Sequence, residues 1–249
     1  MSTPTKTATG TVVWHDHMSN DAATAQGFYG KLLGWQTEVF KPGEMDYPMI
    51  AKEGQTHGGF GPVPEGAPNH WVGHVLVDDA DAAADRARKA GGKVVFGPED
   101  IPDIGRFAII MDPQGAVISA FSPAGEASTP QGVFGWDELH TSDLEGAKKF
   151  YGDVFGWTAK ESDMAGMTYV LFSDGETDRA GATTQMPGDP SPPHWLVYAL
   201  TPDVDASTAK VKDLGGTVYM EPMSLEGVGR FSIAGDPTGA VFGLFQIPA

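Results

Sequence analysis

The chain of 249 residues contains no cysteine. This absence excludes disulfide bonds, thiolate metal ligands, iron–sulfur clusters and a cysteine nucleophile. Any metal ion would have to be held by His, Asp, Glu or water.

Basic residues are also scarce, since 16 Lys and Arg stand against 33 Asp and Glu and the formal net charge is -17 at pH 7. Such a chain repels phosphate groups at long range, so we expect neither nucleic acid nor an anionic membrane as a partner. No apolar run approaches the roughly 18 residues that a membrane span requires. Residues 1–10 are polar and lack the apolar core of a signal peptide, so we expect a loose arm and a cytoplasmic protein.

The sequence does contain a long internal repeat. Phe-Tyr-Gly-Lys-Leu-Leu-Gly-Trp at 28–35 returns as Phe-Tyr-Gly-Asp-Val-Phe-Gly-Trp at 150–157, which is 122 positions later. Four further motifs recur 124 positions apart: His-Trp at 70 and 194, Gly-Gly at 91 and 215, Gly-Arg-Phe at 105 and 229, and Asp-Pro-x-Gly-Ala at 112 and 236. A repeat of this length predicts tandem domains.

The sequence of each half of the chain predicts two units, each with the order strand, helix, strand, strand, strand. In the first half we expect strands at 11–18, 35–40, 48–52 and 57–62, then at 71–77, 93–96, 106–111 and 116–121, with helices at 22–33 and 81–90. In the second half a strand at 134–139 precedes a helix that we expect to open with a capping box of Ser142 and Glu145. The prediction is an α+β fold of four βαβββ units in two domains, residues 11–123 and 132–249, with a linker at 124–131.

These motifs resemble those of the vicinal-oxygen-chelate superfamily, which includes glyoxalases, bleomycin-resistance proteins and extradiol dioxygenases. The resemblance rests on the helix endings Phe-Tyr-x-x-x-x-Gly-Trp, the glycine pairs, Gly-Arg-Phe and Asp-Pro-x-Gly-Ala, and it extends from Thr11 to Pro248. It implies two cupped mixed sheets, each able to hold a small organic molecule, often on a divalent metal. The four units of one chain can pair internally, so the chain is expected to be a monomer or a homodimer.

The resemblance also implies where metal ligands usually lie, and here those positions hold poor ligands. They are Trp14 and Trp136 on the first strands, Val72 and Leu196 on the fifth strands, and Ser119 and Gly243 on the last strands. We therefore expect no resident cofactor. A divalent metal on a displaced set of ligands remains the alternative, and that set would be Asp16, His57, His70 and His74.

Other polar residues can share a cup, because residues two apart on a strand face the same side. We expect Asp16, His70 and His74 together in the first cup, where His57 could join them. In the second cup we expect Glu138, His140, His194 and Tyr198. The candidates for acid–base catalysis are Asp16, Glu138 and His140. Each histidine also has a structural explanation, and His15 and His17 are expected to be exposed to solvent.

The remaining binding candidates are aromatic or basic. Trp14 and Trp136 could stack on a flat apolar ligand, and Trp71 and Trp195 could face either a cup or the core. Trp35 and Trp157 are expected in the core. Arg106 and Arg230 could contact an anion or a carbonyl group, or form structural pairs with Asp112 and Asp236.

Three hypotheses of function follow. The first is a glyoxalase- or bleomycin-resistance-like protein that holds a small, flat or apolar molecule without the usual metal; in one variant it is a metal-free enzyme with Glu138 or Asp16 as a base beside a histidine. The second is a metal-dependent lyase or isomerase of glyoxalase type, or a dioxygenase. The third is an interaction protein whose cups are filled by side chains. The sequence leaves open whether the chain is an enzyme.

Overall fold

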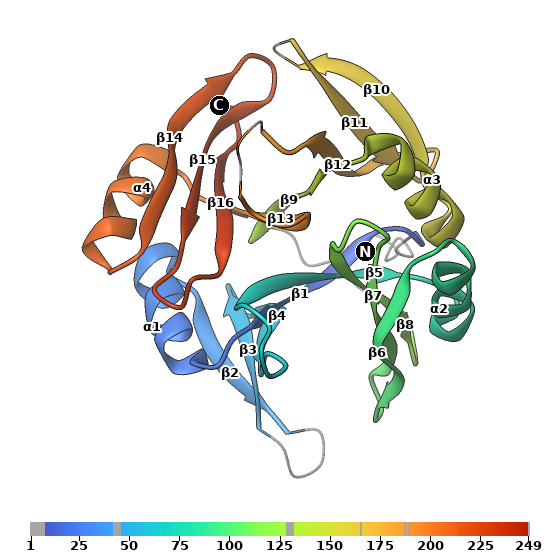
Figure 1. Ribbon diagram of the computed structural model, residues 1–249. Helices are drawn as coiled ribbons and strands as arrows, with labels where there is room; N and C mark the ends of the chain where they lie inside the picture. The colour runs from blue at the N-terminus through green and yellow to red at the C-terminus, as the bar shows by residue number, and fades with distance from the viewer. Residues whose placement is uncertain are drawn as a thin grey trace, which may run out of the picture. The chain divides into compact units, whose positions relative to one another are not determined.

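Four βαβββ units follow one another along the chain (Figure 1). The structure is a computed structural model, and it describes residues 8–41, 46–127, 132–164, 166–186, 188 and 190–248. The first unit comprises β1 (Val12–Met18), α1 (Ala22–Leu33), β2 (Gln36–Phe40), β3 (Tyr47–Lys52) and β4 (Gln55–Gly61). The second comprises β5 (His70–Leu76), α2 (Ala80–Lys89), β6 (Lys93–Ile101), β7 (Gly105–Met111) and β8 (Val117–Pro123).

The second half of the chain repeats this order. The third unit comprises β9 (Phe134–Thr141), α3 (Leu144–Phe155), β10 (Thr158–Met164), β11 (Met167–Ser173) and β12 (Asp178–Thr184). The fourth comprises β13 (His194–Leu200), α4 (Val204–Asp213), β14 (Thr217–Leu225), β15 (Gly229–Gly235) and β16 (Val241–Gln246). None of the helices in the described residues has the length and apolar character needed to cross a lipid bilayer.

The strands form two eight-stranded mixed sheets. Their orders are β2-β3-β4-β1-β5-β8-β7-β6 and β10-β11-β12-β9-β13-β16-β15-β14. Within each sheet the first strand of a unit pairs in parallel with the last strand of that unit, as β1 does with β4 and β13 does with β16. The predicted α+β fold of four βαβββ units is confirmed.

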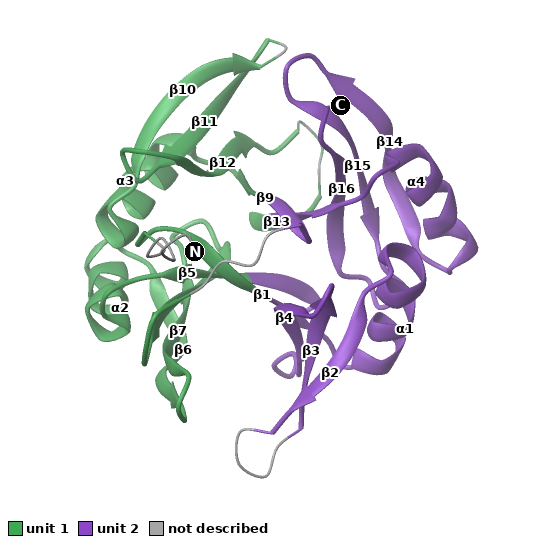
Figure 2. Ribbon diagram, turned by 180° about the vertical axis from the view of Figure 1, so that it is seen from behind, with its two compact units in different colours: residues 1–14, 73–129, 137–195 green, residues 15–72, 130–136, 196–249 purple. Residues whose placement is uncertain are grey.

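The chain also divides into two compact units, each built from segments of both halves (Figure 2). The first contains residues 1–14, 73–129 and 137–195, and in it α2 packs on α3. The second contains residues 15–72, 130–136 and 196–249, and in it α1 packs on α4. The tandem-domain boundaries at 11–123 and 132–249 stay a prediction, and residues 128–131 of the predicted linker lie outside the described residues.

The ends of α3 show how the local sequence forms the helix. Asp143 is the N-cap, because its side chain accepts a hydrogen bond from the Gly146 amide. Gly156 ends the helix with a positive φ of 74°, which favours glycine. The predicted capping box was therefore wrong by one position: the cap is Asp143 and not Ser142, and Glu145 pairs with Lys148 instead.

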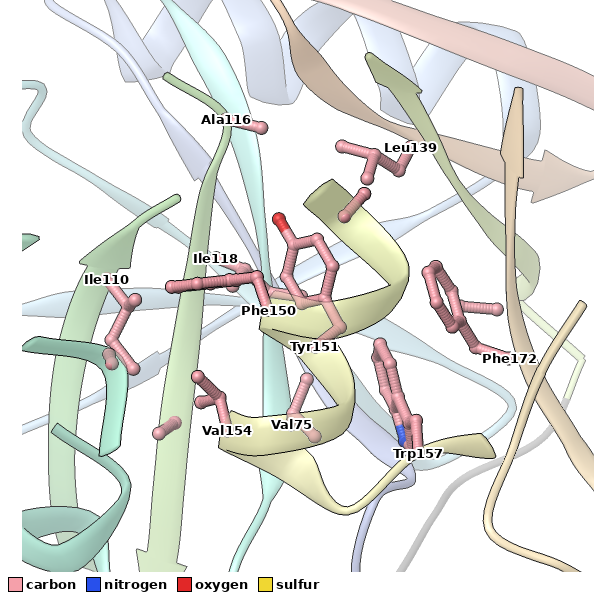
Figure 3. Close-up of a cluster of buried hydrophobic side chains, with 14 of the residues drawn as sticks. Val75, Ile110, Ala116, Ile118, Leu139, Phe150, Tyr151, Val154, Trp157 and Phe172 are labelled. Carbon is pink, nitrogen blue, oxygen red and sulfur yellow. The ribbon is translucent and has the colours of Figure 1, made fainter. Parts of the chain in front are cut away.

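The buried face of α3 forms much of the core of the first compact unit (Figure 3). Phe150 and Tyr151 project from the helix among strand residues such as Ile118, and Trp157 stacks on Phe172 at a ring-centroid distance of 5.4 Å. The recurring Phe-Tyr-x-x-x-x-Gly-Trp segment thus serves packing. Trp157 is buried, and Trp35 occupies the matching place in the second unit, as predicted.

A buried hydrogen-bond relay joins three of the recurring motifs in the first compact unit. The Trp195 indole N–H donates to the Tyr151 hydroxyl at 2.9 Å, and that hydroxyl donates to Asp112 Oδ2 at 2.9 Å. Asp112 Oδ1 accepts hydrogen bonds from the amides of residues 114, 115 and 116 and so closes its own turn. Burial, followed by the nearby Asp112 carboxylate, raises the pKa of Tyr151 well above its usual value, so the hydroxyl stays a donor.

The second compact unit contains the same Trp–Tyr–Asp relay with one addition. The Trp71 indole donates to Tyr29, and Tyr29 donates to Asp236 Oδ2. Here His17 Nε2 also lies 2.7 Å from Asp236 Oδ2, whereas the first unit has Leu139 at the equivalent position. The expectation that His15 and His17 are exposed was wrong. His17 is fully buried in this relay, and the His15 ring lies 4.1 Å from that of Phe134.

The relay predicts that each tyrosine hydroxyl stabilises its own unit. Tyr151→Phe and Tyr29→Phe each leave an indole N–H without its acceptor and remove one hydrogen-bond donor from a buried carboxylate, although Asp236 keeps its contact with His17. We expect each to lower the free energy of unfolding by about 1–3 kcal/mol. Urea unfolding followed by tryptophan fluorescence measures the change. Tyr219→Phe, at a tyrosine that is 59% exposed, is the control and should have little effect. Unchanged stability in both buried variants would contradict a role for the relay.

The second relay also predicts a dependence of stability on pH. Burial opposes ionisation of Asp236, but hydrogen bonds from His17 and Thr238 outweigh it and hold the Asp236 pKa below its ordinary value of 3.8. A carboxyl group with a lowered pKa contributes stability above 3.8 that is lost as pH falls through the folded-state value. Unfolding free energies measured between about pH 5 and pH 2 should fall less steeply in Asp236→Asn than in the unchanged chain. Equal slopes for the two proteins would refute this.

Candidate functional site

Strand β9 presents a row of half-buried side chains. Along it Trp136, Glu138 and His140 are half-buried, and they alternate with buried neighbours. The side chains of Glu138 and His140 are 14% and 15% exposed, so both remain accessible to a small molecule. The alternation follows from the strand, in which successive side chains point to opposite faces.

Glu138 is held by both of its carboxylate oxygens. His140 Nε2 lies 2.9 Å from Glu138 Oε1, and the Tyr169 hydroxyl donates to Glu138 Oε2 at 2.8 Å. Tyr169 comes from β11, which pairs with β12, and in β12 Gly181 lies opposite Glu138. Side chains from two strands of one sheet, β9 and β11, therefore fix the orientation of this carboxylate.

The chemistry of the pair fixes the tautomer of His140. A carboxylate only accepts hydrogen bonds, so the Nε2 atom that faces Glu138 carries the hydrogen. In the neutral ring Nδ1 then holds the lone pair, and in the described part of the chain it has no hydrogen-bond partner. His140 thus has one nitrogen anchored to a carboxylate and the other able to accept a proton from a ligand.

His194 completes the cluster. Its ring stacks on that of His140 with centroids 5.0 Å apart and planes at 22°. Its Nδ1 lies 2.9 Å from the Pro192 carbonyl oxygen, an acceptor, so Nδ1 carries the hydrogen in this ring. We define Glu138, His140, Tyr169 and His194 as the Glu–His cluster.

The structure brings together three of the four residues predicted for the second cup and adds one that sequence reasoning missed. Tyr198, the fourth, is buried, and its ring packs against those of Phe231 and Phe245. Tyr169 was the residue missed. Its signal was present in the repeat, because Tyr47 and Tyr169 are 122 positions apart, like Asp16 and Glu138.

In the first half of the chain the predicted residues are distributed differently. Asp16 accepts a hydrogen bond from the Tyr47 hydroxyl, and His70 Nδ1 lies 2.8 Å from the Pro68 carbonyl oxygen. Burial lowers the pKa of His70 below its usual value, which favours the neutral ring. His57 and His74 are buried, and the His74 ring lies 6.3 Å from that of Phe107.

The side chains present do not fit the metal positions that the sequence resemblance implied. Within the described residues, no group of three or more His, Asp or Glu side chains is placed to hold an ion, and this applies to Asp16, His57, His70 and His74 as well. A Cβ atom on Gly243 would collide with the Tyr198 ring, so the usual acidic ligand has no space there. Ser119 is fully buried, with its hydroxyl 3.5 Å from the carbonyl oxygen of Ala120.

The other binding candidates lie in structural contacts. Trp71 and Trp195 are buried and donate to the relay tyrosines. Arg106 bonds to Asp81 at 2.6 Å and to Asp100 at 2.9 Å.

Arg230 makes the equivalent pair with Asp205 at 2.7 Å. The expected partners Asp112 and Asp236 were wrong, because their carboxylates belong to the relays. Trp14, like Trp136, is half-buried on the more open face of its strand.

Comparison with known proteins identifies relatives along nearly the whole chain. The chain is 33% identical to "Putative glyoxylase CFP32" of Mycobacterium bovis, with 95% of each chain covered. It is 31% identical to "Anthracycline biosynthesis protein DnrV" of Streptomyces peucetius, over 98% of this chain and 95% of that one. The crystal structure of the Mn(II)-bound glyoxalase from Novosphingobium aromaticivorans matches with a TM-score of 0.64 at 20% identity, covering 97% of this chain and 82% of that chain, which shows a shared fold.

A protein-family model also matches the sequence in both of its halves, over residues 16–119 and 134–244. The match includes β9, α3 and the turn at Asp236, which are the elements that carry the Glu–His cluster and the relays. The chain therefore belongs to the Glyoxalase/Bleomycin resistance protein/Dioxygenase superfamily.

Proposed function

We propose that the chain binds a flat aromatic carbonyl compound at the Glu–His cluster and transfers a proton on it without a resident metal. The observation that carries this proposal is the Glu138–His140 hydrogen bond, which leaves the Nδ1 lone pair of His140 accessible. A carboxylate that orients an imidazole is a common arrangement for general base catalysis.

Each residue of the cluster has one role in this reaction. His140 Nδ1 accepts a proton from a carbon that is conjugated with the ligand's carbonyl group through an aromatic ring, and the electron pair of the broken C–H bond moves through that ring to the carbonyl oxygen. Glu138 stabilises the imidazolium ion that forms, and Tyr169 keeps Glu138 in place. Return of the proton to the same or another ligand atom completes an exchange or an isomerisation. His140, rather than the predicted Glu138, is the base.

A flat aromatic ligand suits a site of this kind for an energetic reason. An ordinary enolate concentrates charge on one oxygen and needs strong electrostatic stabilisation. An anion that is delocalised over fused aromatic rings needs less of it, so the absence of the usual metal ligands costs less for such a substrate.

Two further observations support a flat ligand. Trp136 lies two positions before Glu138 on β9, so both side chains point to the same face of the strand. Trp136 is half-buried there, and its indole ring can stack on an aromatic molecule. The relative from Streptomyces peucetius bears the name of an anthracycline biosynthesis protein. Anthracyclines contain fused, flat rings with carbonyl groups.

Metal-dependent chemistry is the second candidate, because a solved structure of the same fold is a Mn(II)-bound glyoxalase. Against it stands the donor set: the last-strand positions are Ser119 and Gly243, and neither offers a carboxylate. We therefore favour the metal-free reaction.

Anthrone tests the proposed reaction, because it is neutral and flat and its methylene group is a carbon acid next to aromatic rings. The purified protein should accelerate exchange of these hydrogens for deuterium, measured by NMR in D₂O without oxygen. We expect His140→Gln and Glu138→Gln each to reduce the rate by about a hundredfold, since each removes general base catalysis. Glu145→Gln, at an exposed carboxylate on α3, is the matched control. Full exchange activity in both cluster variants would refute the proposed function.

Metal content separates the two candidates. Protein purified without an affinity tag should contain less than about a tenth of an equivalent of any divalent transition metal, and a chelator should leave anthrone exchange unchanged. Elemental analysis by mass spectrometry measures the content. One tightly bound ion per chain, with exchange activity that is lost with a chelator and restored by Mn²⁺, would instead establish the metal-dependent reaction.

A further inference from the structure

The first half of the chain contains a counterpart of the Glu–His cluster in which two residues differ, Asp16 in place of Glu138 and Met18 in place of His140. Asp16 and Tyr47 lie 122 positions before Glu138 and Tyr169, and each tyrosine hydroxyl donates to its carboxylate. Position 18 is Met, where the second half has His140. We call Asp16, Tyr47 and Met18 the Asp–Met cluster.

The polar geometry of the Asp–Met cluster is specific. Strand β4 places Gly59 opposite Asp16, and a side chain at Gly59 would collide with the Tyr47 ring and hydroxyl. Because Gly59 has no side chain, the Tyr47 ring has room to reach the Asp16 carboxylate. Gly181 takes the same position opposite Glu138.

The histidines that begin β5 and β13 are fixed in the same way in both halves. His70 Nδ1 lies 2.8 Å from the carbonyl oxygen of the residue two positions before it, and His194 Nδ1 lies 2.9 Å from its own equivalent. In both rings Nδ1 therefore carries the hydrogen and Nε2 is left as the acceptor. The orientation of the histidine has thus been retained without an imidazole at position 18.

The loss of that imidazole changes what the cluster can do. A thioether neither accepts a proton near neutral pH nor forms a strong hydrogen bond with a carboxylate. Its flexible and polarisable chain does make favourable contacts with aromatic rings. Met18, Asp16 and Tyr47 are half-buried, so a ligand can reach them.

We propose that the Asp–Met cluster is a second binding site for the same class of flat aromatic carbonyl compound, in particular one that bears a hydroxyl group, and that it holds the ligand without transferring a proton. Asp16 accepts a ligand hydroxyl hydrogen bond, and Met18 packs on the ring. This inference rests on the proposed function for the class of ligand. It assigns the two halves different tasks, with reaction in the second and retention in the first.

Binding stoichiometry tests this inference separately from the reaction. Emodin, a hydroxylated anthraquinone without an acidic methylene group, is titrated into the intact chain by isothermal calorimetry. We expect about two equivalents bound by the unchanged chain and about one by Asp16→Asn. Tyr47→Phe is the second variant, with the same expectation of weakened binding in the first half only. Thermal unfolding without ligand checks that both variants fold. One equivalent in the unchanged chain, unaffected by either variant, would overturn the inference.

A graft tests whether Met18 is the reason for the missing reaction. His140→Met should abolish anthrone exchange while both equivalents of emodin still bind. Adding Asp16→Glu and Met18→His to that variant recreates the Glu–His pair in the first half and should restore exchange at least tenfold above the His140→Met background. Two bound equivalents without restored exchange would overturn the binding-only explanation. If His140→Met keeps its exchange activity, the proposed function fails, whereas the binding stoichiometry still decides the second site.

Discussion

The structure depends on a buried tyrosine hydroxyl that lies between an indole N–H and a carboxylate. In each compact unit this hydroxyl joins a helix, the first strand of one βαβββ unit and the turn between two other strands. An unpaired buried carboxylate is costly, so each member of the relay constrains the others. The recurring Tyr, Trp and Asp therefore serve one interaction, although they stand far apart in the sequence.

Because the relay and the aromatic core occupy one face of β9, the other face is left for polar chemistry. Leu139 and Thr141 are buried, whereas Glu138 and His140 between them retain contact with solvent. A rigid strand is a suitable support for an acid–base pair, since small displacements weaken proton transfer. Tyr169 adds a second restraint from another strand of the same sheet.

The two halves have kept the same framework and changed their polar residues. Leu139 packs in the core of the first unit, whereas its counterpart His17 enters the relay of the second unit. One position further along, His140 pairs with a carboxylate, whereas its counterpart is Met18. The imidazole therefore lies on the buried face of β1, as His17, and on the more open face of β9, as His140. A histidine on the buried face strengthens a structural hydrogen bond, and one on the open face can accept a proton from a ligand.

The sequence by itself determined the four βαβββ units, the glycines that end α1 and α3, and the packing of Phe150 and Tyr151. These features follow from periodicity, turn residues and the spacing of the repeat, all of which are local or directly visible in the chain. The pairing of Glu138 with His140 was also within reach, because both lie on one strand. Only the tertiary structure decided that Tyr169 orients Glu138, that Asp81 rather than Asp112 pairs with Arg106, and that the Tyr198 ring fills the space beside Gly243. The physical reason is that each of these contacts joins segments from different elements, where strand register and side-chain rotamers, rather than sequence spacing, set which atoms meet.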